Sequence, residues 1–330
     1  MSFTVTLQPS GNKFECEANE SVLEAALKSG INLNYHCATG GCGECRARII
    51  EGKVKDHRYF DFVIPEAEKI NKTVLLCSVA ANSDLVIEAN EAVQAKDIPL
   101  QHIGVKVAKI ERPNSSNLIL HLRTPRSSTL RFLAGQYIQI ASSKLESSYH
   151  YVASCPCNGM IIQLHLRSDN LSANDAAYQS LKVGDALEVS GPYGEFTLDE
   201  ASRRPIVMVA QDIGFAPMKS VIEHAIALDL PQSMYLFWFA EYGQEHYYAN
   251  YCRSWEDALD CFIYRPFHLD KLDNGENNYV SAANFVLERT PIESEVDVYL
   301  AGPDPMLEIL KNAFHSKGTP EPRIHIAKPG

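Results

Sequence analysis

The spacing of apolar residues changes twice along this chain of 330 residues. Up to residue 92, short alternating segments surround one helical segment, which indicates a β-grasp arrangement. Between residues 101 and 200, regular short strand-like runs separated by turns indicate an antiparallel β-barrel. From 203 to 330, continuous apolar runs alternate with helical segments, as in a Rossmann-like parallel sheet. We therefore expect a multidomain protein, α+β followed by α/β, with domains at 1–92, 101–200 and 203–330.

The first domain is expected to begin with a β-hairpin. Residues 3–7 and 13–17 alternate apolar and polar side chains around a Pro-Ser-Gly-Asn turn. A short helix follows, because Ser21 can cap its start, Glu24 completes a capping box and Gly30 can end it. The remaining strands of this domain are expected at 46–52, 73–77 and 84–88.

The elements of the other two domains follow from the same patterns. Strands of the barrel are expected at 105–110, 118–122, 136–140, 160–166 and 186–190. In the third domain, strands are expected at 205–210, 234–240 and 296–301, and helices at 216–227, 282–288 and 305–315. Pro217 suits the first turn of its helix. Nucleotides bind such sheets at the carboxyl ends of the strands, near helix N-termini.

Four cysteines carry the clearest chemical signal in the chain: Cys37, Cys42, Cys45 and Cys77. Four residues separate the first two and two separate the next pair, which is the C-x₄-C-x₂-C…C spacing of a plant-type [2Fe–2S] site. Gly40, Gly41 and Gly43 fill the gaps. Glycines let such a loop turn tightly and aim backbone N–H groups at the cluster sulfurs. We therefore expect these four thiolates to bind a [2Fe–2S] cluster.

Charge and composition exclude several classes of partner and site. The net charge of −11 argues against nucleic acid or an anionic membrane, since either needs a basic surface. Residues 1–7 do not resemble a signal peptide, and no apolar run is long enough to span a bilayer. Nine cysteines, four of them in a ligand motif, favour the reducing cytoplasm over a disulfide scaffold. Cys155 and Cys157 could bind a metal or form a redox pair, but two thiols without further ligands are a poor metal site, so we expect ordinary packing there.

Several segments match a known family in order and spacing. They are 34–45 and 75–78 in the first domain, 134–137, 151–154, 181–185 and 191–196 in the second, and 214–218 and 300–306 in the third. Through them, the first domain resembles the plant-type ferredoxin domain at the N-terminus of oxygenase reductases. The other two resemble the flavin-binding barrel and the NAD(P)-binding lobe of the ferredoxin–NADP⁺ reductase superfamily.

The resemblance implies that the barrel binds FAD. The corresponding positions are His150, Tyr151, Val152, Ala153 and Ser154, with His165, Leu166, Arg167 and Ser172 nearby. The family pattern at the first group is Arg-x-Tyr-Ser, and here Ser148, His150 and Tyr151 replace its three defined residues. Losing the arginine removes a charge-assisted contact with the FAD diphosphate. Arg167 is the expected substitute cation, and Ser172 the expected phosphate-binding hydroxyl.

The resemblance also implies that a nicotinamide nucleotide binds the third domain. The matching residues are Gly214, Pro217, Gly302, Pro303 and Met306. The family's Gly-Gly-Thr turn is 211–213 here, where bulky side chains obstruct a diphosphate and the carboxylate of Asp212 repels it. Ala301 replaces the cysteine beside the nicotinamide. Glu241 stands where an arginine often binds a 2′-phosphate, so NADH is expected rather than NADPH.

Two functions are consistent with these patterns. In the first, the protein passes electrons from NADH through FAD to the [2Fe–2S] cluster and on to a redox partner such as an oxygenase. In the second, the cluster serves an electron carrier or a complex subunit whose reductase body has lost flavin or nicotinamide activity. The departures at three separate motifs favour this alternative more than any single one would.

Overall fold

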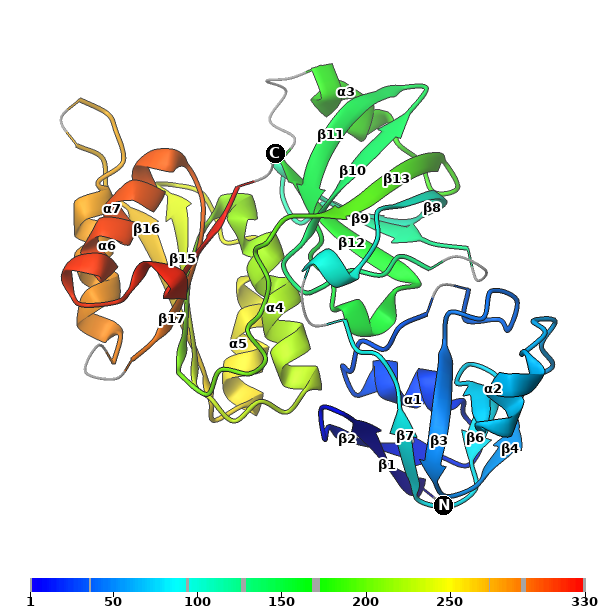
Figure 1. The fold of residues 1–330 in the computed structure, drawn as a ribbon. Coiled ribbons are helices and arrows are strands. Elements are labelled where there is room, and N and C mark those ends of the chain that lie inside the picture. Colours follow the sequence, from blue (N-terminus) through cyan, green and yellow to red (C-terminus); the bar gives the residue numbers. More distant parts are fainter. Residues whose placement is uncertain are drawn as a thin grey trace.

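The computed structural model describes residues 2–35, 37–92, 95–125, 129–167, 173–272, 274–291 and 295–328. These residues build three main sheets, and each sheet contributes to a hydrophobic core of its own (Figure 1). The expected multidomain α+β and α/β fold class is confirmed. No helix in the described ranges is long and apolar enough to cross a membrane.

The N-terminal sheet has the strand order β2-β1-β7-β3-β5. Its strands are β1 (Ser2–Gln8), β2 (Lys13–Glu17), β3 (Arg46–Glu51), β5 (Thr73–Leu75) and β7 (Leu85–Glu88); β4 (Val54–Asp56) pairs separately with β6 (Val79–Ala81). The helices are α1 (Val22–Lys28) and α2 (Glu66–Ile70). Strand β1 pairs antiparallel with β2 and parallel with β7, as in a β-grasp fold. The predicted capping box is present between Ser21 and Glu24.

The second sheet is antiparallel and closes into a barrel. Its order is β11-β10-β13-β8-β9-β12. The strands are β8 (Gln101–Glu111), β9 (Asn117–Arg123), β10 (Tyr137–Ser142), β11 (Leu145–Tyr151), β12 (Ile161–Arg167) and β13 (Ala186–Tyr193). A bridge between Val152 and Leu164 links the chain after β11 to β12, so the two ends of the sheet meet. Helix α3 (Ala173–Ser180) packs against β11.

The third sheet is parallel, in the order β16-β15-β14-β17-β18. Its strands are β14 (Ile206–Gln211), β15 (Met234–Glu241), β16 (Phe262–Leu269), β17 (Asp297–Ala301) and β18 (Ile324–Ala327). The helices are α4 (Phe215–Ala227), α5 (Ala249–Ala258), α6 (Tyr279–Arg289) and α7 (Asp304–Ser316). Figure 1 shows α4 and α5 on the face toward the other two domains, and α6 and α7 on the outer face. The central strands are therefore buried on both faces, which explains their continuous apolar runs.

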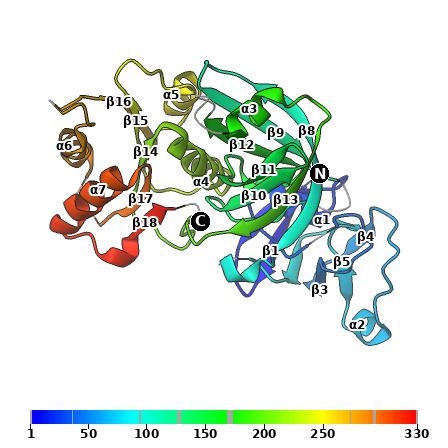
Figure 2. The ribbon, with the colours of Figure 1, turned by 90° about the horizontal axis from the view of Figure 1, so that it is seen from above.

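The N-terminal domain contacts both other domains (Figures 1 and 2). The side-chain amide of Asn32 donates to the backbone carbonyl of Phe132 in the barrel, at 3.1 Å. Arg131 donates to the side-chain oxygen of Asn34 at 2.5 Å. At the end of α1, a Cβ on Gly30 would lie 3.1 Å from Leu228, just beyond α4. All three domains thus meet on one side of α4.

Candidate cofactor sites

The cluster loop brings the four predicted cysteine ligands together in two pairs. Cys45 and Cys77 have their sulfur atoms 3.3 Å apart. Cys37 and Cys42 form the second pair, since each thiol shifts the pKa of the other. All four are free thiols, and only Cys42 is partly exposed. Each iron of a [2Fe–2S] cluster takes two thiolates, so a paired arrangement of four thiols fits that cofactor.

Backbone groups in the loop point at the sulfur atoms. The N–H of Thr39 donates to Cys37 and that of Glu44 to Cys42, both at 3.4 Å. Such bonds stabilise thiolates, the form that binds metal. The hydrogen bond from the Cys45 thiol lowers the pKa of Cys77 to about 6. Cys37 and Cys77, one thiol of each pair, thus have lowered pKa values, while those of Cys42 and Cys45 are raised.

At two of the three loop glycines, both a positive φ and a lack of room for a Cβ atom require glycine. Gly40 has φ of 84°, and a Cβ there would lie 2.6 Å from the Cβ of Phe60. Gly43 has φ of 78°, and its Cβ would lie 2.4 Å from the ring of Phe62. Gly41 has neither restriction. Phe60 and Phe62 therefore cover the loop closely, at the two positions where it turns.

A cleft of about 440 Å³ lies between the barrel and the α/β domain. The barrel contributes residues of β11 and β12, and the α/β domain contributes residues from the carboxyl ends of β14, β15 and β17. Seven residues that the sequence assigned to flavin or nicotinamide line it: His150, Tyr151, His165, Arg167, Gly214, Gly302 and Pro303. The fold thus joins the two predicted sites into one cavity, of a size usual for small-molecule sites.

Other predicted residues lie beside this cleft and do not line it. Val152, Ala153, Leu166, Pro217 and Met306 are buried. Ser154 faces α4, where its backbone carbonyl accepts a hydrogen bond from Ser220 at 2.8 Å. Ser172 lies outside the described residues. A binding role for these positions remains a prediction.

His165 is a buried polar side chain in the cleft wall with one unused nitrogen. It is 3% exposed, and Nδ1 is 2.9 Å from the hydroxyl of Tyr247. Nε2 has no hydrogen-bond partner among the described residues. Burial lowers the pKa of His165. An unsatisfied buried nitrogen is costly, so a bound group that completes its hydrogen bonding would be stabilised here.

His150 occupies the position of the family's ring-contacting tyrosine, but its contacts lead to α3. Its Nε2 lies 2.7 Å from the hydroxyl of Tyr178 and 3.0 Å from that of Ser148. The two hydroxyls are 2.6 Å apart. Burial lowers the pKa of His150 to about 4. Ser148, His150 and Tyr178 thus form a neutral network between β11 and α3. Ser148 and His150 stand where the family has the arginine and the tyrosine of its flavin motif.

Arg167 is the one arginine or lysine among the described residues that line the cleft. Its guanidinium donates to the carboxylate of Asp212 at 3.3 Å, which links the barrel to the turn after β14. Burial raises the pKa of Asp212. The substitute cation expected from the sequence is therefore present in the cleft, and it faces the carboxylate that replaces a family glycine.

Gly214 and Gly302 hold the turns at the ends of β14 and β17 against neighbouring protein atoms. A Cβ on Gly214 would lie 2.4 Å from the carbonyl oxygen of Ala301. A Cβ on Gly302 would lie 2.4 Å from Met306 and 3.3 Å from Gln211. The space of each side chain is thus filled by protein. These glycines, with Met306 beneath Gly302, shape the cleft edge by close packing.

Sequence reasoning missed several residues that line the cleft. Tyr149 directly precedes His150 in β11 and also lines the cavity. Tyr279 donates to the side chain of Gln211 at 3.0 Å from the start of α6. Ala327 comes from the end of β18. A local signal does point to Tyr149, because shifting the family's flavin motif by one residue puts Tyr149 at the tyrosine position.

Comparisons with known proteins agree with this architecture. Residues 5–82 match the 2Fe-2S iron-sulfur cluster binding domain, and residues 208–312 match the oxidoreductase NAD-binding domain. The chain is 29% identical to the CDP-6-deoxy-L-threo-D-glycero-4-hexulose-3-dehydrase reductase of Yersinia pseudotuberculosis, over 97% of this chain and 96% of that protein. It is 25% identical to the propane 2-monooxygenase reductase component of Rhodococcus jostii, over 98% and 90%.

Among solved structures, the fold resembles a cytochrome P450 reductase from Amycolatopsis. The TM-score is 0.61 at 22% identity, covering 99% of this chain and 98% of that one. This likeness extends through all three sheets, including the barrel that neither family match covers. The chain is therefore an oxidoreductase in which a segment matching the 2Fe–2S cluster binding domain precedes one matching the oxidoreductase NAD-binding domain.

Proposed function

We propose that this protein passes electrons from NADH through FAD to its [2Fe–2S] cluster, and from there to a separate redox enzyme. The observation that carries the proposal is the cleft of about 440 Å³ that the barrel and the α/β domain share. When bound, FAD accepts a hydride and releases single electrons, which matches a two-electron donor to a one-electron cluster. The residues of the cleft are accordingly assigned to holding two cofactors against each other.

The barrel side of the cleft is assigned to the flavin. Tyr149 and Tyr151 offer aromatic surface, and Nε2 of His165 offers an unused hydrogen-bonding position. Arg167 supplies the positive charge that a diphosphate requires. Its present partner is Asp212, so we infer that the guanidinium turns from that carboxylate to the diphosphate on binding.

The α/β side is assigned to the nicotinamide nucleotide. Gly214, Gly302 and Pro303 lie at the carboxyl ends of parallel strands, where nucleotides bind such sheets. Pro217 and Met306 support the two turns from within the packed helices. Glu241 also lines the cleft, and its carboxylate would repel the 2′-phosphate of NADPH. NADH is therefore the proposed donor.

The cluster domain is placed to receive electrons from the barrel. Cys42 and Glu44 line a pocket that Gln101 and Arg131 of the barrel also line. The cluster loop thus borders the barrel across one small cavity. The partly exposed side of Cys42 is the proposed route by which electrons enter or leave the cluster.

The identity of the acceptor is inferred from relatives. The propane 2-monooxygenase and phenol 2-monooxygenase relatives are named as reductase components of their oxygenases. The Yersinia relative is named as the reductase of a dehydrase. We propose an oxygenase or a similar redox enzyme as the partner, with no nucleic acid involved. A reducing cytoplasm is the proposed location, because it would keep the four cluster thiols available as ligands.

One observation favours the alternative of an electron carrier with an inactive reductase body. The Asp212 carboxylate occupies the turn that the family keeps free for a diphosphate, and it already neutralises Arg167. A cleft arranged in this way would disfavour both cofactors, while the cluster site would be unaffected.

A single anaerobic preparation separates the two functions. Iron, acid-labile sulfide and released flavin are measured per chain, and the visible absorbance of the cluster is followed after NADH is added. The reductase predicts about two irons, about two sulfides, one FAD and rapid bleaching. Two irons with no flavin and no bleaching by NADH would establish the carrier instead. Cys42→Ser serves as the control, because it removes a ligand and should abolish bleaching while flavin stays bound.

A further inference from the structure

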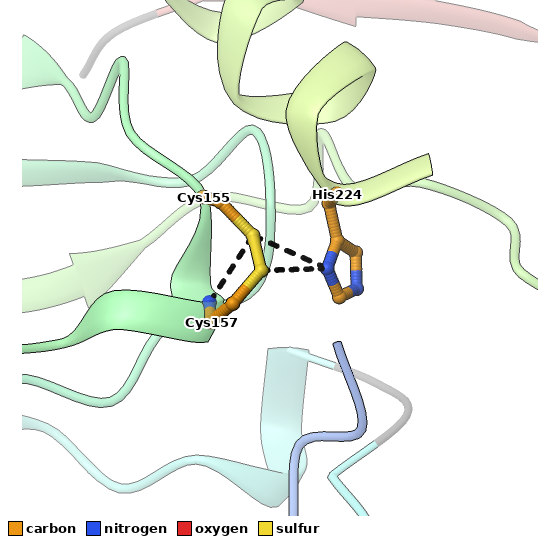
Figure 3. A group of neighbouring side chains, drawn as sticks. All are labelled: Cys155, Cys157 and His224. Carbon is orange, nitrogen blue, oxygen red and sulfur yellow. Dashed lines mark hydrogen bonds between the residues drawn. A yellow bond between two sulfur atoms is a disulfide. The ribbon is translucent and has the colours of Figure 1, made fainter. Parts of the chain in front are cut away.

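Cys155, Cys157 and His224 form a second group of metal-binding side chains, away from the cluster loop (Figure 3). The two cysteines flank Pro156 in the short 3₁₀ helix η2 (Pro156–Asn158), between β11 and β12 of the barrel. His224 comes from α4 of the α/β domain. Helix α1 of the first domain also packs against η2. The group therefore lies where all three domains meet.

The three potential ligand atoms face one another. Nδ1 of His224 is 3.8 Å from the sulfur of Cys155 and 3.9 Å from that of Cys157. At usual Zn–S and Zn–N bond lengths, two ligand atoms of a tetrahedral zinc ion are about 3.6 Å apart. The two observed sulfur–nitrogen separations are close to this value. Figure 3 shows the imidazole ring directed at both sulfur atoms.

The hydrogen bond at the other ring nitrogen of His224 decides which tautomer of the imidazole faces the sulfur atoms. Nε2 lies 2.8 Å from a carboxylate oxygen of Glu200. An ionised carboxylate only accepts hydrogen bonds, so Nε2 carries a proton, and in the neutral ring Nδ1 therefore keeps its lone pair. A carboxylate behind the histidine is the usual arrangement at protein metal sites, where it orients the ring and raises its basicity. His224 is 1% exposed, so this orientation is held by packing.

In the structure, the two sulfur atoms are joined as a disulfide. Neither sulfur of a disulfide carries a proton, so neither can donate to the Nδ1 lone pair. In the reduced state the same atoms become two thiols beside the imidazole of His224. That set of two sulfurs and one nitrogen, with a fourth position open, is typical of a thiophilic cation site.

We propose that, once this disulfide is reduced, Cys155, Cys157 and His224 bind one thiophilic divalent cation of the zinc class. A dithiol reductant of the thioredoxin class gives two electrons and two protons, and the S–S bond becomes two S–H groups. The cation then displaces both thiol protons to solvent and takes the Nδ1 lone pair, with water as its fourth ligand. A two-electron oxidant of the diazene class, such as diamide, takes two electrons from the two thiolates, which re-forms the S–S bond and releases the cation.

The site is structurally independent of the cofactor cleft. Gly214, at the cleft end of α4, precedes His224 by ten residues, which is a rise of about 15 Å along a helix. The cation would tie η2 of the barrel to α4. Existing contacts already hold these elements together: Glu223 accepts from the backbone N–H of Cys155 at 3.1 Å. A bound cation is therefore expected to fasten the barrel to the α/β domain.

The test uses the complete protein with its iron–sulfur cluster intact. Samples are reduced anaerobically with a phosphine, freed of reductant, mixed with Zn²⁺ and desalted, and zinc and iron are measured together by mass spectrometry. Reduced wild type is expected to retain about one zinc per chain with its iron unchanged. Wild type oxidised with diamide should retain none. Unchanged iron shows that zinc has not entered the cluster loop.

Variants separate this site from incidental thiol binding. Cys157→Ser and His224→Gln should each lose the zinc, and Cys157→Ser remains informative if the buried His224 variant fails to fold. Cys261→Ser, which removes a partly exposed thiol elsewhere, should keep it. Glu200→Gln should weaken zinc binding about tenfold or more without abolishing it. No zinc in the reduced wild type, or equal zinc in Cys157→Ser, would overturn the proposal.

Discussion

Asp212 combines two unfavourable features at the edge of the proposed nucleotide site. It has φ of 49°, a left-handed conformation that costs free energy for residues other than glycine. Its carboxylate lies in the cleft, 3.3 Å from Arg167, and burial raises its pKa. The family has a glycine-rich turn at this place. The chain thus accepts backbone strain and a repulsive charge where a diphosphate is expected to bind.

Replacing this residue should improve cofactor binding. Asp212→Gly removes the charge and frees Arg167, so the KM for NADH is expected to fall about fivefold, which corresponds to about 1 kcal/mol of lost repulsion. Steady-state kinetics with a chemical electron acceptor would measure this change. Asp229→Gly is the matched control, because Asp229 also has φ of 49° but does not line the cleft. Equal KM values for the two variants would contradict a direct role for the Asp212 charge.

The cluster loop is the element in which sequence spacing and structure agree most directly. Three ligands lie within nine residues, and their arrangement depends on local turns that glycines permit. Gly43 combines φ of 78° with a Cβ position 2.4 Å from the ring of Phe62. Gly41 has no neighbour within 4 Å of its Cβ position. A side chain therefore has room at position 41 and has none at position 43.

Gly43→Ala should disturb the loop, and Gly41→Ala should not. In the first variant the added methyl group must displace Phe62 and adopt a left-handed conformation, which costs roughly 1–3 kcal/mol. We expect its iron content to fall to less than about half of the wild-type value, since a distorted loop misplaces Cys42 and Cys45. Iron and acid-labile sulfide per chain would be measured for both. Full cluster content in Gly43→Ala would show that the loop tolerates a side chain there.

The contact between β11 and α3 should make stability depend on pH. His150 has a pKa of about 4 in the folded protein because it is buried, against about 6.5 when unfolded. Between these values the unfolded chain binds the extra proton, so stability rises with pH across this window. The contribution lost between pH 7 and pH 5 is about 2 kcal/mol.

His150→Gln should therefore reduce the loss of stability between pH 7 and pH 5 by about 2 kcal/mol. Urea unfolding followed by circular dichroism at the two pH values would measure it. Tyr178→Phe separates this effect from the loss of a hydrogen bond: it removes one partner, lowers stability at both pH values, and should keep the pH dependence. An unchanged pH dependence in His150→Gln would mean that this imidazole titrates alike in both states.

Longer-range parts of the fold and site had weaker signals in the sequence. The edge strand β16 was missed because Arg265 and Pro266 interrupt its apolar run, although an edge position tolerates proline. His224 lies 67 residues after Cys157, and no local pattern links them. Gly214 and Gly302 line the cleft as the sequence predicts, but that protein atoms fill the space of their side chains depends on the packing of Ala301 and Met306. Contacts between residues that are far apart in the sequence depend on tertiary packing, and the sequence patterns do not predict them.

The three domains act together only if the first one stays docked on the barrel. Asn32 donates to the backbone of Phe132 at 3.1 Å, and Asn34 accepts from Arg131 at 2.5 Å. Both bonds cross from the cluster domain to the barrel, and Asn34 and Arg131 line the pocket beside Cys42. Electron transfer falls steeply with distance, so these contacts should control how often the cluster is close enough to be reduced.

Removing both side chains should uncouple the domains without harming either cofactor. At about 1 kcal/mol for each hydrogen bond, Asn32→Ala combined with Asn34→Ala lowers the ratio of docked to undocked molecules about thirtyfold. Rapid mixing with NADH should then show flavin reduction at the wild-type rate followed by slower bleaching of the cluster. Asn12→Ala is the control, since Asn12 bonds to Glu91 within the first domain. Dithionite should bleach the cluster fully in all variants, and wild-type kinetics in the double variant would mean that docking does not limit electron transfer.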